Sequence, residues 1–73
     1  MISNIRGERS RLDMTQGQLA ESLGVAESTI RRWEDGATRP SPQALIDMSG
    51  MFGCTIDWLL GRTDDRLGTY QGR

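Results

Sequence analysis

The chain has 73 residues, 36% of them hydrophobic, which is enough for one domain with a small core. There is no histidine and only one cysteine, Cys54, which argues against His/Cys metal sites, Ser–His or Cys–His catalytic pairs and a disulfide within the chain. The nine basic residues are all arginine and are outnumbered by ten acids, so loose attachment to any DNA through bulk positive charge should be weak. We therefore expect a protein that is not an enzyme and that holds no cofactor and no metal.

Two helices are predicted in the first third of the chain. Hydrophobic residues at helical spacing indicate a first helix from about Ser3 to Leu12, with Arg9 as the one charged member of its apolar stripe. A second helix is expected to begin at Thr15, whose hydroxyl can cap it, and to end at Gly24. No segment alternates in the manner of a strand, so the expected fold class is all-α.

A third helix is predicted from Glu27 to Glu34. Val25 and Ile30 have the spacing of a hydrophobic staple around its start, although Ala26 is a poor N-cap. The connection between the second and third helices is three residues that begin with a glycine. Such a connection is typical of two short helices that cross steeply, as in a helix-turn-helix.

Two further helices follow a polar connection. Ser41 and Pro42 have the character of an N-cap and a first helical residue, and Gly53 ends this fourth helix. Thr55 is expected to cap a short fifth helix that reaches Leu60. We expect the domain to span residues 1–63 and residues 64–73 to form a polar, disordered C-terminal tail, because the tail has few apolar side chains to bury.

Two runs in this chain, TQGQLAESLGV at 15–25 and TIRRWEDG at 29–36, resemble the phage-repressor and Cro-like (XRE-type) helix-turn-helix family. The pair PS at 40–41 and the run FGCTIDWLLG at 52–61 resemble the later helices of that family, so the likeness covers about residues 2–63. It implies a compact, five-helix, lambda-repressor-like fold that binds a double-stranded DNA operator with its third helix in the major groove. The sequence departs from the family pattern at Ala26, Ser49 and Glu27, the last standing where many relatives have Gln or Arg.

The resemblance also implies roles for individual residues. The side chains expected to face base edges are those of Glu27, Ser28, Arg31 and Arg32. The residues expected to bind phosphate are Gln16, Gln18, Thr38 and Arg39. Arg32 can donate two hydrogen bonds to a guanine, whereas Arg31 suits a base or a phosphate equally well. Glu27 has two interpretations, as an acceptor for a cytosine amine or as an acid that stabilises the first turn of its own helix.

A second implied feature is an ion pair between Arg9 and Glu34, which joins the first and third helices in the family. We interpret both residues as structural, since a guanidinium on an apolar stripe needs a buried partner. Arg9 and Glu34 are therefore set apart from the residues expected to touch DNA.

Two functions stay open. One is a sequence-specific regulator of the repressor kind that forms a homodimer, at least on DNA. The other is a helix-turn-helix protein-interaction module, such as an antitoxin or anti-repressor component, which the acidic balance favours. The apolar residues that could form either a homodimer seam or a monomer core are Met48, Met51, Phe52, Ile56 and Leu60.

The expected location follows from segments that the chain lacks. No apolar run approaches the roughly 20 residues of a membrane span, and the N-terminus has no secretory signal. With the family resemblance, this predicts a cytoplasmic protein encoded by a bacterium or a phage, with no membrane contact. No small-molecule ligand is evident.

Overall fold

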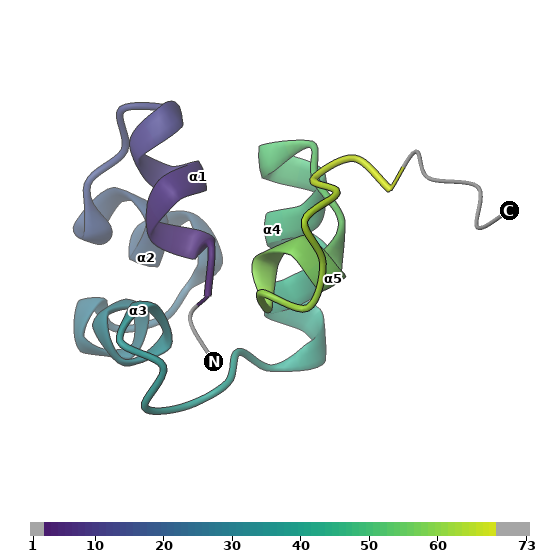
Figure 1. Ribbon diagram of the computed structural model, residues 1–73. Coiled ribbons are helices and arrows are strands. Elements are labelled where there is room, and N and C mark those ends of the chain that lie inside the picture. The colour runs from purple at the N-terminus through teal and green to yellow at the C-terminus, as the bar shows by residue number, and fades with distance from the viewer. Residues whose placement is uncertain (1–2, 69–73) are drawn as a thin grey trace, which may run out of the picture.

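The computed structural model describes residues 3–68. Within that range the secondary structure is α-helical without a strand, which confirms the all-α prediction. The five helices are α1 (Ile5–Arg11), α2 (Gln16–Leu23), α3 (Glu27–Glu34), α4 (Pro42–Phe52) and α5 (Ile56–Leu59). Helices α1, α2 and α3 pack together on one side of the molecule, and residues 35–41 lead to α4 and α5 on the other (Figure 1). No helix in the described range is long and apolar enough to cross a membrane.

Local signals set the ends of α2 as expected. The Thr15 hydroxyl accepts a hydrogen bond from the Gln18 N–H at 3.0 Å, and Gln18 Oε1 accepts one from the Thr15 N–H at 2.8 Å. This reciprocal capping box satisfies two donors that a helix start otherwise leaves unpaired. Gly24 follows the helix in the left-handed conformation, with φ at 70°, which glycine adopts without steric strain.

Helix α3 begins at Glu27 without a capping side chain, because Ala26 precedes it. Its position depends on packing instead, since Ile30 and Trp33 are buried in the core. Helix α1 is shorter than the predicted Ser3 to Leu12. The backbone N–H of Asn4 donates to the carbonyl of Leu59 in α5 at 3.0 Å, so the chain just before α1 is bonded to α5.

One side chain from each helix is fully buried, so all five helices meet in a single core. These side chains are Ile5, Leu19, Ile30, Met48 and Leu59. Five apolar residues of the last two helices were left open between a homodimer seam and a monomer core, and three of them, Met48, Phe52 and Leu60, lie in the monomer core. Two apolar residues of α4 are exposed, Met51 at 37% and Ile46 at 57%.

A buried carboxylate joins α1 to the far half of the molecule. Glu8 is 4% exposed, and its oxygens accept hydrogen bonds from Arg66 Nε at 2.6 Å, Trp58 Nε1 at 2.8 Å and Arg11 Nε at 3.0 Å. Arg66 and Arg11 also each donate to the carbonyl of Phe52 at 2.7 Å, which satisfies an acceptor at the end of α4. Sequence reasoning did not identify this cluster.

The segment expected to start the polar tail therefore contains a residue that is tied to the domain. Arg66 lies beyond the predicted boundary at residue 63, and its backbone carbonyl accepts a hydrogen bond from the Thr55 N–H at 3.0 Å. The physical reason is that the buried Glu8 carboxylate needs a cationic partner. Residues 69–73 of the predicted tail lie outside the described residues, so their expected disorder stays a prediction.

The Glu8 cluster predicts an acid-sensitive fold. Hydrogen bonds from Arg66, with those from Trp58 and Arg11, outweigh burial and lower the pKa of Glu8 from 4.5 to about 2. A lowered folded-state pKa means that this stabilisation is present above about pH 5 and is lost as the pH falls towards 2. Chemical denaturation between pH 7 and 2 should show the loss, on the order of 2 to 3 kcal/mol.

The variant Glu8→Gln should lack most of this pH dependence, because it has no carboxylate at that position. It should be less stable than the original chain at pH 7 and nearly equal to it at pH 2. The matched control is Glu21→Gln, at an exposed position on α2, which should keep the original pH profile. A Glu8→Gln variant with an unchanged profile would show that Glu8 does not carry this energy.

Candidate nucleic-acid interface

The interface is built around an ion pair that joins α1 to the end of α3. Arg9 Nε lies 2.7 Å from Glu34 Oε2 and Arg9 Nη2 lies 3.2 Å from Glu34 Oε1, with the two side chains 13% and 3% exposed. Arg9 Nη1 also donates to the carbonyl of Met14 at 2.7 Å. The hydrogen bonds to Glu34 raise the pKa of Arg9, so the guanidinium stays charged. A two-bond pair of this kind fixes direction as well as distance.

The two glutamines expected to bind phosphate already hold partners within the protein. Gln16 Nε2 donates to Glu34 Oε1 at 3.1 Å, and the side-chain oxygen of Gln18 belongs to the capping box. The first N–H groups of any α-helix have no partner inside the helix, so at the start of α2 the backbone of residues 16 and 17 is still available as a donor. Gln16 thus lies beside α3 and helps to fix where α2 begins relative to it.

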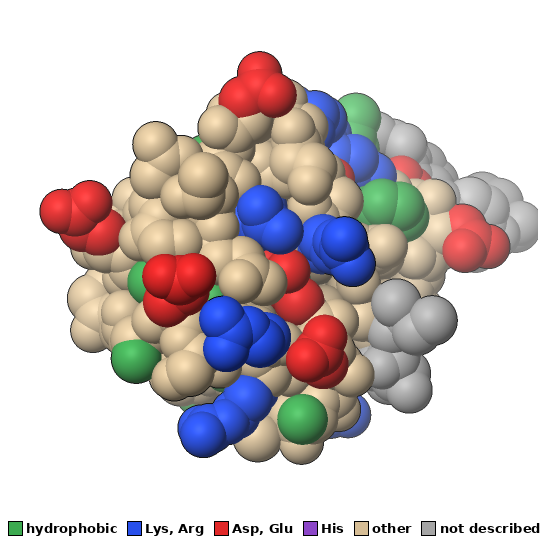
Figure 2. All heavy atoms as spheres, turned by 90° about the vertical axis from the view of Figure 1, so that its left-hand side faces the viewer, with side chains coloured by type: hydrophobic (Ala, Val, Ile, Leu, Met, Phe, Trp, Pro, Cys, Tyr) green, Lys and Arg blue, Asp and Glu red, His purple; other side chains and the backbone are tan. Residues whose placement is uncertain are grey.

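The four residues expected to face bases lie together on α3. Glu27, Ser28, Arg31 and Arg32 are all exposed. Ser28, Arg31 and Arg32 follow Glu27 by one, four and five positions, which places all four on one face of the helix. Ile30 and Trp33 point into the core. On the side of the molecule that bears α2 and α3, arginine and acidic side chains are interleaved (Figure 2). The exposed face of α3 is therefore mixed in charge and not simply basic.

A shallow polar groove of about 580 Å³ runs between α1, the start of α2 and α3. Its lining residues are Arg6, Arg9, Thr15, Gln16, Glu27, Arg31, Glu34 and Asp35. Arg6 was missed by sequence reasoning, although its position three residues before Arg9 places both on the same side of α1. The groove brings Arg6 and Arg31, from two different helices, to one surface.

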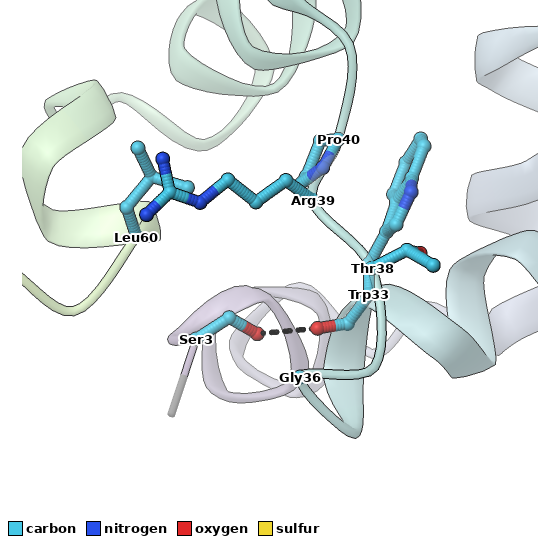
Figure 3. A pocket seen from close by; sticks show the side chains of 7 residues that line it. All are labelled: Ser3, Trp33, Gly36, Thr38, Arg39, Pro40 and Leu60. Carbon is cyan, nitrogen blue, oxygen red and sulfur yellow. Dashed lines mark hydrogen bonds between the residues drawn. The ribbon is translucent and has the colours of Figure 1, made fainter. Parts of the chain in front are cut away.

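Thr38 and Arg39 lie elsewhere. They line a separate pocket of about 230 Å³ behind the end of α3, together with Ser3, Trp33, Gly36, Pro40 and Leu60. In Figure 3 the Arg39 side chain extends towards Leu60 of the far half of the molecule, and Ser3 donates a hydrogen bond to the Trp33 carbonyl at 3.1 Å. None of these residues lines the groove, and of the four expected phosphate contacts only Gln16 does.

Comparison with known proteins shows a match to one protein family and to several transcriptional regulators. A helix-turn-helix family model matches residues 5–59. The chain is 31% identical to the HTH-type transcriptional regulator DicA of Escherichia coli strain K12, with 89% of this chain and 48% of the relative covered. It is 33% identical to repressor protein C2 of Salmonella phage P22, with coverage of 82% and 28%.

A third relative is of another kind. The chain is 45% identical to the type II methyltransferase M.SsoII of Shigella sonnei, with 97% of this chain and 23% of the relative covered. The chain thus spans about half the length of DicA and about a quarter of the other two relatives. No solved structure matches it.

The contacts of Arg9 and the exposure of Arg32 predict a large loss of stability for one substitution and almost none for the other. Arg9→Ala should lower the free energy of unfolding by about 3 to 5 kcal/mol, because it leaves the buried Glu34 carboxylate without its cation. In a domain of this size that is a fall in melting temperature of more than about 10 °C. Arg32→Ala should change stability by less than about 0.5 kcal/mol. Thermal unfolding followed by circular dichroism measures both, and the reverse order would contradict the structural role of Arg9.

Proposed function

Because the chain belongs to the phage-repressor and Cro-like helix-turn-helix family, we propose that it is a sequence-specific transcriptional regulator of the repressor kind. In this proposal α3 enters the major groove of DNA and its exposed face reads base edges. The observation that carries the proposal is the division of α3 into a buried side, held by the core and the Arg9–Glu34 pair, and an exposed side with two arginines and a serine. We place its activity in the cytoplasm of a bacterium, where operator DNA lies.

The exposed side chains of α3 contact different parts of the DNA. Arg32 donates hydrogen bonds to the O6 and N7 of a guanine, since a guanidinium matches those two acceptors, and Ser28 lies one turn before it. Arg31 lines the groove opposite Arg6, so we assign both to the phosphate backbone. Arg39 does not line the groove, but it is exposed in the loop that follows α3, and we assign it to a further phosphate.

The glutamines at the start of α2 act mainly through their backbone. The side chain of Gln16 is bonded to Glu34, and that of Gln18 to Thr15. The free N–H groups of the first turn of α2 remain as phosphate donors. The two side chains therefore hold this turn in place, and their amide groups are secondary contacts.

We further propose that the chain binds as a two-fold homodimer to half-sites about one helical turn apart. The exposed side chains of Ile46 and Met51 on α4 supply apolar surface for a contact between protomers. With three phosphate-binding arginines in each protomer, the logarithm of the binding constant should fall with the logarithm of salt concentration with a slope of about −3 per protomer. This is a modest electrostatic term, in keeping with a net charge of −1.

We propose no catalytic step for the chain itself. Its single cysteine, Cys54, is buried, and burial raises the pKa of the thiol, so it packs as a small apolar side chain. The match to M.SsoII covers 23% of that methyltransferase and gives no reason to assign the enzyme's chemistry here. A protein-interaction module is the second candidate, because Glu27 and Asp35 add exposed negative charge beside the arginines of the groove.

Selection of duplexes from a random library by the whole chain tests the proposal. One sequence class should be enriched, and Arg32→Ala should lose about 1 to 3 kcal/mol of discrimination at one G·C pair. The control is Arg62→Ala, since Arg62 pairs with Asp57 on α5 and lines neither the groove nor the pocket. If no duplex is enriched and none is bound at low salt, the interaction module is the better description.

A further inference from the structure

The start of α2 and the start of α3 are fitted to each other through a glycine and a carboxylate. Gly17 occupies the second position of α2, where alanine would favour the helix. A Cβ at Gly17 would lie 3.3 Å from Glu27 Oε1, closer than an ordinary van der Waals contact. Glycine at this position therefore leaves space for the Glu27 carboxylate beside the first turn of α2.

Glu27 lines the polar groove between α1, α2 and α3. Helix α2 has no acidic residue in its own first turn, so Glu27 of α3 supplies the negative charge that the positive end of α2 favours. Arg6 and Arg31 line the same groove. Glu27 is exposed to solvent, and no side chain at Gly17 stands between its carboxylate and the first turn of α2.

We propose that the Glu27 carboxylate competes with the DNA backbone for the groove between α1, α2 and α3. A phosphate that approaches Arg6 and Arg31 is repelled by this negative charge. The DNA backbone binds only if the carboxylate moves away or if other contacts offset the repulsion. The repulsion is the same for every DNA sequence. The Gly17–Glu27 pair thus lowers the affinity for DNA in general and makes stable binding depend on the base contacts of α3.

This inference rests on the proposed function and differs from both sequence-based interpretations of Glu27. A base-reading Glu27 would give discrimination at one cytosine, which is lost when the carboxylate is lost. A purely structural Glu27 would affect the stability of α3 and leave DNA binding unchanged. A competing Glu27 weakens binding to every duplex, so its neutralisation strengthens binding without altering sequence preference.

The test uses the whole chain and two 20-base-pair duplexes, one carrying the selected site and one of unrelated sequence. Glu27→Gln should bind both duplexes about three- to tenfold more tightly at 50 mM salt, and the gain should shrink towards onefold at 300 mM as the charges are screened. Glu21→Gln makes the same change in net charge at an exposed position of α2 that does not line the groove, and it should gain less than about twofold.

A second variant moves the carboxylate without removing it. Gly17→Ala places a methyl group against the end of the Glu27 side chain, so it should give a smaller gain in affinity for both duplexes. If Glu27→Gln binds both duplexes like Glu21→Gln, or binds the selected site more weakly, the competition is refuted while the proposed function stands. A wild-type chain that binds neither duplex refutes both.

Discussion

The arrangement of α1, α2 and α3 depends on one ion pair, between Arg9 of α1 and Glu34 at the end of α3. The same guanidinium bonds the Met14 carbonyl, and the same carboxylate accepts from Gln16 at the start of α2. Four segments thereby share one network of charge-assisted hydrogen bonds. Since α3 lacks an N-cap at Ala26, its orientation relies on this network at one end and on its buried side chains along its length.

Adjacent residues of α1 connect the two halves of the molecule. Arg9 bonds to Glu34 of α3 and to the Met14 carbonyl just before α2, while Glu8 accepts hydrogen bonds from Trp58 of α5 and from Arg66. A seven-residue helix thus acts as the common support for both sides of the core. One consequence is that the position of α3 does not depend on its exposed side chains. The exposed face can therefore carry a mixture of arginine, serine and glutamate.

Much of the fold was predictable because its signals are local. Thr15, Gly24 and Ser41 act through neighbours within a few residues, and α3 has the bounds that were expected. The pairing of Glu8 with Arg66 spans 58 residues and has no local signal. The fit of Gly17 to Glu27 joins two different helices and likewise has no local signal.

The choice between a homodimer seam and a monomer core could not be made from the sequence for a different reason. A count of hydrophobic side chains on the last two helices says how much surface needs cover, but the three-dimensional packing decides which ones are covered. Met48 and Phe52 therefore lie in the core, and Ile46, which was not considered for the seam, is exposed. Family resemblance identified the partners Arg9 and Glu34, which spacing alone does not pair.

A double-mutant cycle on the Arg9–Glu34 pair, with Arg9→Met, Glu34→Leu and both together measured by chemical denaturation, tests most directly whether this pair holds α1 and α3 together. The double variant should be more stable than the sum of the single losses by at least about 2 kcal/mol, because each single change strands a buried charge. Losses that add to within about 0.5 kcal/mol would contradict this dependence.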